Sequence, residues 1–482
     1  MSGRDAHRVA RALIDGRFVP TTGAEASLTT PVDGSAHGAV RFAGAAEVDG
    51  ALNAALRARP AAEALPVAAR VGALRRLADR MEADGGELAA LVTAENGCPA
   101  RQAVALQVGA AVGLLRAYAE LAETHVFEER RAAFRGGHTL VRKLPVGVAV
   151  GVVPWNVPHF LACMKLAPAI AAGVPIVLKP APETSLSGDR LAALLAELDL
   201  PPGMLGVLPG DAQVGQALVG DPRVDKVSFT GSTAAGRAIA EVCARRFARC
   251  TLELGGKSAA VLLDDVDLDR ALPQLFLATL QNNGQVCGAQ SRLLVPRSRA
   301  RELVDALAAF FESLVVGDPR DDRTQVGPVV SARQRDRILG YLALGPEEGA
   351  TVAAGGGPGP GPGFTVQPTL FADANNRMRI AREEIFGPVV TVIDYRDEAD
   401  AVALANDSEM GLSGSVWSAD PDRALAVARR LRTGTVGLGT KRILDFGSPF
   451  GGFRASGIGR ELGPEGIDAF LETQTLLIPD PG

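Results

Sequence analysis

The sequence predicts an α/β fold with two lobes, of which the first is a doubly wound sheet. Short apolar, β-rich runs alternate with helical segments in two blocks, residues 140–231 and 256–440. Strands and helices that alternate in this way pair in parallel through right-handed crossovers. The length agrees with this, because 482 residues exceed one small domain and can bury extensive cores.

The chain before the first block is helical. Residues 65–121 are rich in Ala, Leu, Arg and Glu at helical spacing, as in the segment 70–77, RVGALRRL. This pattern predicts long amphipathic helices. No residue in them suggests chemistry.

The first block supplies the sheet in which a site is expected. Sheets of this kind bind nucleotides at the C-terminal ends of their strands. Strands are expected at 146–153, 175–178, 205–208 and 224–229, and helices at 159–172, 185–198, 211–219 and 233–246.

The second block predicts another α/β lobe. Its strands are expected at 259–263, 291–295, 389–395 and 414–417. The segment 355–363, GGGPGPGPG, alternates Pro and Gly, so it is neither a helix nor a central strand but an exposed turn or linker.

Charge and hydropathy exclude several classes of partner. The chain has 50 basic and 55 acidic residues, a net charge of -5 and no long block of one sign, so we expect no nucleic-acid partner. Residues 1–20 lack the apolar core of a signal peptide, and no run approaches the roughly 20 apolar residues that span a bilayer. We therefore expect a cytoplasmic protein with no membrane partner.

The cysteines point to reduced thiols rather than to a metal site. There are five, at 98, 163, 243, 250 and 287, and they form no CxxC pair and no Cys/His cluster with zinc-ligand spacing. The first four are best interpreted as small buried apolar residues.

Cys287 is a candidate nucleophile. It lies between glycines in the string GQVCG, residues 284–288, where backbone amides can approach an oxyanion. A thiol becomes reactive where its surroundings favour the thiolate. On this string alone, a structural cysteine remains an open alternative.

Glu253 is a candidate general base. It ends an apolar run just before two glycines in TLELGGK, residues 251–257, at the expected boundary between the lobes. A carboxylate that is partly desolvated in a cleft has a raised pKa and can act as a base. A salt-bridged carboxylate at a strand end is the alternative.

Asn156 is a candidate oxyanion donor. It follows the first strand of the sheet in VPWNVP, residues 153–158, where two prolines restrict the backbone. An amide in that place can stabilise a developing oxyanion, an effect worth roughly 3 kcal/mol for one donor. An asparagine in a turn is otherwise unremarkable.

Together these strings resemble the aldehyde dehydrogenase superfamily over nearly the whole chain. The resemblance includes PWNVP, LELGGKS, GQVC, EEIFGPV and SPFGGFRASGIGRE in that order, and the spacing of 34 residues between Glu253 and Cys287. One such motif is weak, but five in order are specific.

The resemblance implies a mechanism for NAD(P)-dependent oxidation of an aldehyde to a carboxylic acid. Cys287 attacks the carbonyl carbon, and Asn156 and the Cys287 amide hold the oxyanion. After hydride transfer, water activated by Glu253 hydrolyses the thioester. Lys165 and Glu461 match positions that relay the proton away from the base, with a structural buried ion pair as the alternative.

The cofactor residues are also implied by resemblance. Lys179 should contact the adenosine ribose, and Gly231 and Ser232 precede a helix whose N-terminus favours a pyrophosphate. No GxGxxG fingerprint is present. Further positions that match the cofactor site, or are otherwise ordinary core residues, are Val153, Trp155, Gly210, Glu384 and Phe386. Pro182 stands where many NAD-preferring members carry Glu, with Glu183 one place later, so NADP is possible. NAD is expected because no added Arg or Lys is evident there for a 2'-phosphate.

The substrate passage is expected to be largely apolar. By resemblance it is lined by Phe160, Leu161, Met164, Val286, Leu444, Phe446 and Phe450. The segment GLGTKR, residues 437–442, departs from the family pattern at its two glycines. Lys441 or Arg442 there could favour an acidic aldehyde, and a solvated loop charge is the alternative. The sequence does not name the aldehyde.

The resemblance also implies the domain organisation. We expect a Rossmann-like doubly wound NAD(P)-binding domain at 1–122 and 146–255 and a second α/β catalytic domain at 256–455. A small β oligomerisation element at 123–145 and 472–482 contains strands at 126–143 and 472–478, and an exposed strand edge needs a partner. A homodimer or homotetramer is therefore expected.

Three rival functions remain open. A CoA-acylating dehydrogenase would resolve the thioester with CoA, but such relatives typically lack the base at Glu253. A catalytically silent structural or binding protein would keep the fold without the chemistry. A papain-like hydrolase is disfavoured because no histidine lies in a string that suggests a base for Cys287.

Overall fold

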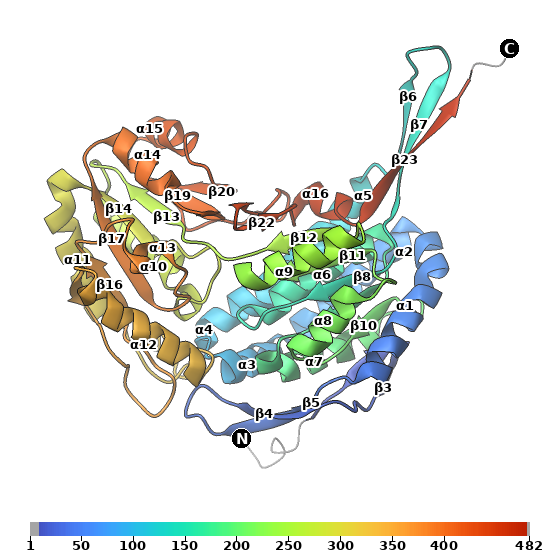
Figure 1. Ribbon diagram of the computed structural model, residues 1–482, viewed down its shortest axis with the longest axis horizontal. Helices are drawn as coiled ribbons and strands as arrows, with labels where there is room; N and C mark the ends of the chain where they lie inside the picture. Colours follow the sequence, from blue (N-terminus) through green and yellow to red (C-terminus); the bar gives the residue numbers. More distant parts are fainter. Residues whose placement is uncertain (1–8, 480–482) are drawn as a thin grey trace.

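The computed structural model describes residues 9–479 and contains two large sheets with helices on both faces, from which a small antiparallel sheet projects (Figure 1). The ends of the expected first domain (1–8) and of the C-terminal strand segment (480–482) lie outside the described residues.

The first sheet has eight strands in the order β22-β12-β11-β8-β9-β10-β2-β3. The parallel strands are β8 (Ala149–Val152), β9 (Ile176–Lys179), β10 (Leu205–Val207), β11 (Lys226–Thr230) and β12 (Arg249–Glu253). The antiparallel edge strands are β2 (Ala12–Ile14), β3 (Arg17–Val19) and β22 (Gly457–Ile458). The chain runs outward from β8 to β10 and returns to β11 on the other side of β8. The strand order thus reverses between β8 and β11, and the crevice at such a reversal is the usual ligand site of the fold.

The four strands expected in this block are confirmed, but the first begins later than predicted. Residues up to Pro145 belong to a strand of another sheet, and Gly147 adopts a φ of 121°. That conformation favours glycine, so the chain turns here instead of continuing as one strand from 146 to 153. The Asp225 carboxylate accepts a hydrogen bond from the Val148 amide (2.8 Å) and fixes the turn.

Helices cover both faces of this sheet, and two of those between the strands begin at side-chain caps. The Asp211 carboxylate caps α8 by accepting from the Gln213 and Val214 amides. The covering helices are α1 (Ala45–Ala64), α2 (Val67–Ala83), α3 (Gly85–Asn96), α5 (Ala110–Thr124), α6 (Pro158–Ala172), α7 (Ser185–Ala196), α8 (Ala212–Gly220) and α9 (Thr233–Arg245), with the short η2 (Pro182–Thr184) before α7.

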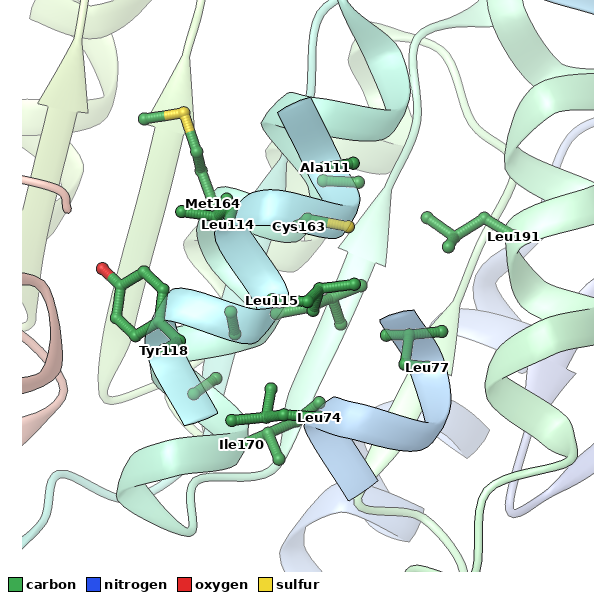
Figure 2. Packing of buried hydrophobic residues seen from close by; sticks show 14 of the residues in the cluster. Leu74, Leu77, Ala111, Leu114, Leu115, Tyr118, Cys163, Met164, Ile170 and Leu191 are labelled. Carbon is green, nitrogen blue, oxygen red and sulfur yellow. The ribbon is translucent and has the colours of Figure 1, made fainter. Parts of the chain in front are cut away.

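The largest core cluster packs α2, α5 and α6 together (Figure 2). Leu74 and Leu77 from α2 meet Leu114 and Leu115 from α5 and Ile170 from α6, and all five are inaccessible to solvent. Each such side chain contributes roughly 1.5–3 kcal/mol of burial free energy. The packing therefore fixes α6, the helix that follows Asn156.

The helical run 100–124 combines α4 (Ala100–Ala103), a π-helix η1 (Val104–Gly109) and α5. Among the described residues it is the one helix long and apolar enough to cross a bilayer, although the sequence suggested none. Because Leu114, Leu115 and Tyr118 are buried in the core, its apolar character serves packing. Single π-turns occur frequently at functional sites.

The second sheet has the order β15-β16-β17-β14-β13-β19-β20 and confirms the second lobe. Its strands are β13 (Ala259–Leu262), β14 (Arg292–Pro296), β15 (Thr351–Ala354), β16 (Thr369–Ala372), β17 (Val389–Tyr395), β19 (Ser413–Trp417) and β20 (Thr435–Leu438), all parallel to their neighbours except β15. Its helices are α10 (Leu268–Thr279), α11 (Ala300–Glu312), α12 (Ala332–Glu347), α13 (Arg379–Arg382), α14 (Glu398–Asn406) and α15 (Pro421–Ala428), with η3 (Gln281–Gly284) and η4 (Arg297–Arg299). The strands β15, β16 and β20 were not predicted. The segment 355–363 contains no helix, as expected.

The projecting sheet has the order β23-β7-β6 and is antiparallel (Figure 1). Its strands are β6 (Glu128–Ala132), β7 (His138–Pro145) and β23 (Leu471–Ile478), in agreement with the expected excursion. The remaining elements are β1 (Val9–Ala10), β4 (Glu25–Thr29) and β5 (Ala36–Arg41) in one small sheet, the pair β18 (Met410–Gly411) and β21 (Phe453–Arg454), and α16 (Gly463–Asp468).

Candidate active site

A cleft of about 810 Å³ opens where the strand order of the first sheet reverses. One wall follows β8 and another follows β11, while segments of the second lobe close the far side. It is lined by Pro154, Trp155, Asn156, Thr230, Gly231, Ser232, Leu254, Gly255, Cys287, Gln334, Arg337, Glu384 and Phe386. Seven residues predicted for catalysis or cofactor binding therefore share one cavity, although they come from positions 155 to 386 of the chain.

Cys287 is held at this cleft by an unusual turn. Asn282 and Asn283 adopt left-handed φ values of 53° and 61°, and Gly284 follows at 73°. Non-glycine residues in that region store strain and cluster at functional sites. Burial raises the pKa of the Cys287 thiol to about 12, with the Glu384 and Glu253 carboxylates adding to the rise and the backbone amides of Gly288 and Cys287 opposing it. The resting thiol is therefore protonated at neutral pH and needs a base to become a nucleophile.

Asn156 is buried, and its amide links the cleft to the cysteine loop. The Nδ2 group donates to the Gln285 carbonyl oxygen at 2.9 Å, two residues before Cys287. Pro158 is the first residue of α6, where the N–H that proline lacks would have no partner within the helix. Its ring restricts the backbone between β8 and α6. One N–H of the Asn156 amide remains for a ligand in the cleft.

Glu253 is the last residue of β12 and is only 3% exposed. Neither carboxylate oxygen has a hydrogen-bond partner among the described residues. Burial holds the pKa of Glu253 well above its ordinary value; the nearby Glu461 carboxylate raises it further, and Lys165 and Arg460 lower it. A buried carboxyl group with free oxygens and a raised pKa has the properties of a general base.

Lys165 and Glu461 form a buried ion pair with 2.9 Å between Nζ and Oε1. Lys165 Nζ also donates to Thr230 Oγ1 (2.7 Å), and Ser228 Oγ donates to the same Glu461 oxygen (2.8 Å). The second Glu461 oxygen has no partner among the described residues. Thr230 pairs with Glu253 in the register of β11 and β12, so this polar group lies beside the candidate base.

Two aromatic rings and one carboxylate that were predicted to bind the cofactor line the cleft. Trp155 and Phe386 meet edge to face, with ring centroids 5.4 Å apart, and Phe386 adopts a left-handed φ of 61°. The Glu384 carboxylate accepts from the Gly256 amide at 3.1 Å, and burial raises its pKa to about 7. A Cβ at Gly255 would lie 2.2 Å from that carboxylate, so the glycine is needed for this approach.

Gly231 and Ser232 lead into α9, as predicted. Ser232 caps the helix by accepting from the Ala235 amide at 3.3 Å. The helix N-terminus consequently points its partial positive charge toward the cleft, which suits a pyrophosphate. The donor set fits a dinucleotide, because a helix N-terminus, two aromatic rings and a carboxylate line the same cleft.

Lys179 and Gly210 meet each other, but neither belongs to the lining of the cleft. Lys179 Nζ donates to the Gly210 carbonyl oxygen at 2.6 Å. Burial lowers the pKa of Lys179 to about 8, against the opposing effects of the Glu183 and Asp211 carboxylates. Val153 is buried at the end of β8, where its amide donates to the Lys179 carbonyl (3.0 Å).

The predicted substrate residues separate into three groups. Phe160, Leu161, Met164 and Phe450 are buried in the largest core cluster, against which Cys287, Leu444 and Phe446 pack. Val286 instead lines a smaller cavity with Lys441 and Ile443. Arg442 is exposed to solvent. An apolar wall beside the cysteine therefore exists, and Arg442 is not part of it.

Several residues at the site were not found from the sequence. Gln334 and Arg337 lie on α12 and reach the cleft; Gln334 Nε2 donates to the carbonyls of Ile385 and Phe386 at 3.1 and 2.9 Å. Arg337 donates to the Glu384 carbonyl at 2.5 Å. Both stand in an ordinary polar helix face, RQRDR, so no local signal distinguishes them from solvated residues. No group of three or more potential metal ligands occurs within residues 9–479.

Comparisons with known proteins agree with this arrangement. The model of the aldehyde dehydrogenase family matches residues 18–476. The chain is 49% identical over 405 residues to geranial dehydrogenase of Castellaniella defragrans, covering 84% of each chain, and 38% identical over 476 residues to a betaine aldehyde dehydrogenase of Rhizobium etli, covering 96% of each. Among solved structures it is similar to the Mycobacterium tuberculosis aldehyde dehydrogenase complexed with NAD+, with a TM-score of 0.95, 42% identity and coverage of 98% of this chain and 99% of the other. The chain therefore belongs to the aldehyde dehydrogenase family.

Proposed function

We propose that this protein oxidises an apolar aldehyde to its carboxylic acid with NAD+. The observation that carries the proposal is that Cys287 and Asn156 line the same cleft as the start of α9, Glu384 and Phe386. A carbonyl held at the thiol would thus lie within reach of a dinucleotide bound along the same cavity.

In this mechanism Cys287 attacks the carbonyl carbon and forms a thiohemiacetal. Since the pKa of the resting thiol is about 12, the attack requires loss of the thiol proton, and Glu253 is the base that accepts it. The free N–H of Asn156 and the Cys287 amide hold the oxyanion. NAD, when bound, supplies the hydride acceptor.

Once the thiohemiacetal carbon has lost its hydride, collapse of the oxyanion leaves a thioester on Cys287. Glu253 then removes a proton from water, and the resulting hydroxide attacks the thioester carbonyl and releases the carboxylic acid and the Cys287 thiolate. The pair of Lys165 and Glu461 moves the proton away from Glu253, supported by their contacts with Thr230 and Ser228. The free oxygens of Glu253 favour hydrolysis over transfer of the acyl group to CoA.

The proposal extends to cofactor, substrate and assembly. The Glu183 and Asp211 carboxylates flank Lys179 and would repel a 2'-phosphate, which favours NAD over NADP. The wall of Phe160, Phe446 and Leu444 favours an apolar chain, and geranial dehydrogenase, one of the relatives, acts on an apolar aldehyde by its name. We also propose a cytoplasmic location, the two-domain division given above and a homo-oligomer joined through β23.

The experiment is an assay of NADH formation at 340 nm with a panel of neutral and carboxylated aldehydes. The protein should reduce NAD with neutral apolar aldehydes, without CoA, and release a carboxylic acid. Cys287→Ala should still bind NAD, measured by quenching of its fluorescence, and form no NADH. Turnover by Cys287→Ala would refute the assigned nucleophile, and no turnover with any aldehyde would favour a silent protein.

Substitution of the exposed Arg442 tests whether this residue recognises an acidic aldehyde or is only a solvated loop charge. If it is a solvated loop charge, Arg442→Ala leaves the ratio of kcat/KM for a carboxylated and a neutral aldehyde unchanged. A fall in that ratio of more than about threefold, a difference of about 0.7 kcal/mol, would instead support recognition of an acidic substrate.

A further inference from the structure

The main-chain carbonyl oxygen of Asn156 accepts hydrogen bonds from three side-chain amides. The donors are Asn96 Nδ2 at 2.8 Å, Gln107 Nε2 at 3.1 Å and Asn282 Nδ2 at 2.9 Å. All three side chains are inaccessible to solvent. A carbonyl oxygen has two lone pairs, so three donors on one oxygen exceed what satisfying a buried polar group requires.

Two of the three donors come from parts of the chain that are locally unfavourable. Asn96 ends α3, Gln107 lies within the π-helix η1, and Asn282 has a left-handed backbone. A π-turn and a left-handed non-glycine residue each cost conformational free energy, which the surrounding structure must offset. The π-helix and the left-handed turn thus each place a donor on the Asn156 carbonyl oxygen.

Asn282 differs from the other two donors because it also reaches the cysteine loop. Its Nδ2 group lies 3.3 Å from the Gln285 carbonyl oxygen, the atom that accepts from Asn156 Nδ2. The main-chain N–H of Asn282 donates to the Gln102 side-chain oxygen at 2.8 Å, and this bond also holds the turn. The Asn282 side chain therefore connects the backbone at Asn156 with the loop before Cys287.

We infer that Asn282, with Asn96 and Gln107, is a positioning residue that aims the Asn156 amide at the oxyanion formed on Cys287. The inference rests on the proposed function and adds residues to it. One N–H of Asn156 Nδ2 is used on the Gln285 carbonyl, which leaves the other to face the cleft. Holding the Asn156 backbone and the Gln285 carbonyl together fixes the direction of that second N–H.

The chain supplies a matched control at the next residue. Asn283 is equally buried and left-handed, and its Nδ2 group also donates to two carbonyls, those of Gly97 (2.9 Å) and Pro328 (2.8 Å). Its Oδ1 accepts from the Gly327 amide at 2.7 Å. None of these contacts reaches Asn156. Asn282→Gly and Asn283→Gly both suit a left-handed backbone and both remove a buried amide, so they differ mainly in the partner that is lost.

Two reactions of Cys287 distinguish positioning from general disruption. Attack on an aldehyde develops an oxyanion, whereas alkylation by iodoacetamide does not. We expect Asn282→Gly to slow the single-turnover formation of NADH by roughly ten- to a hundredfold, less than the loss of a whole oxyanion donor. Alkylation of the Cys287 peptide, followed by mass spectrometry, should stay within about twofold of the unaltered protein, since no oxyanion is involved. Gln107→Leu should give a smaller effect of the same kind.

A double-mutant cycle with Asn156→Ala completes the test. If Asn282 acts through Asn156, then Asn156→Ala combined with Asn282→Gly forms NADH no more slowly than Asn156→Ala alone. Additive losses, an equal fall in alkylation, or the same selective loss in Asn283→Gly would overturn the inference. Absence of NADH formation by the unaltered protein with every aldehyde would instead overturn the proposed function, and this inference with it.

Discussion

Replacing Lys165 by Met tests whether the buried ion pair serves the base or only the fold. Lys165 is inaccessible to solvent, and its Nζ group bonds Glu461 Oε1 and Thr230 Oγ1. Methionine has a similar length but no charge. Glu461 would be left buried with Ser228 as its remaining hydrogen-bond donor among the residues that the structure describes.

The structure sets the size of the expected loss of stability. Removing one partner of a buried, hydrogen-bonded pair costs about 3–5 kcal/mol because the other charge is left uncompensated. The double variant Lys165→Met with Glu461→Gln removes both charges and should recover most of that loss. Denaturant unfolding of the variants and the unaltered protein measures both quantities.

The pH dependence gives the decisive result. The pKa of Glu253 is raised first by burial and then by Glu461, and it is lowered by Lys165. Removing the cation raises that pKa further, so the acidic limb of thioester hydrolysis moves to higher pH in Lys165→Met. Removing the like charge lowers the pKa, so the limb moves to lower pH in Glu461→Gln. Limbs that stay in place, or that move in the same direction, would refute the role of this pair beside the base.

Three further predictions follow from the site and its surroundings. Glu253→Gln should give one NADH for each Cys287 and then hydrolyse the thioester roughly 10²- to 10⁴-fold more slowly. It should not lose stability, because neither Glu253 oxygen has a hydrogen-bond partner among the residues that the structure describes. A normal steady state in stopped-flow assays would contradict this. Glu183→Gln should lower the ratio of kcat/KM for NAD to that for NADP, since one of the two carboxylates beside Lys179 is neutralised, and an unchanged ratio would remove Glu183 from cofactor choice. Leu477→Lys places a charge on the edge strand β23, where the Leu477 side chain is 78% exposed. The oligomer size measured by light scattering should fall, while the helical circular dichroism signal is retained. An unchanged size would place the interface elsewhere.

The sequence predicted most of the central strands of both sheets, because buried parallel strands are continuous apolar runs, but it missed β16, which lies between β15 and β17. Its errors occur where local geometry overrides hydropathy. Gly147, with its φ of 121°, delays the start of β8, and the π-helix at 104–109 has no distinct periodicity in so short a segment. The edge strand β20 was missed because it is only four residues long and partly exposed.

The site was predictable as far as its residues lie in contiguous motifs. Cys287, Glu253 and Asn156 each stand in such a string, but what surrounds them is assembled across the chain. Asn96 reaches Asn156 over 60 residues, and Lys165 reaches Glu461 over 296. Single amide side chains in helices leave no pattern in the sequence, so Asn96, Gln107 and Gln334 became visible only in the structure.

The pairing of β22 with β12 bears on how the protein is made. Glu253 pairs with Gly457, a Cβ at Gly451 would lie 2.7 Å from its carboxylate, and Glu461 completes the polar group beside it. A chain emerging from the ribosome therefore contains the thiol long before the surroundings that tune the base. Contacts between such distant segments form late in folding. A chain shortened at residue 450 should hold a cysteine and a nucleotide crevice yet turn over no aldehyde, so the catalytic machinery stays silent until synthesis is almost finished.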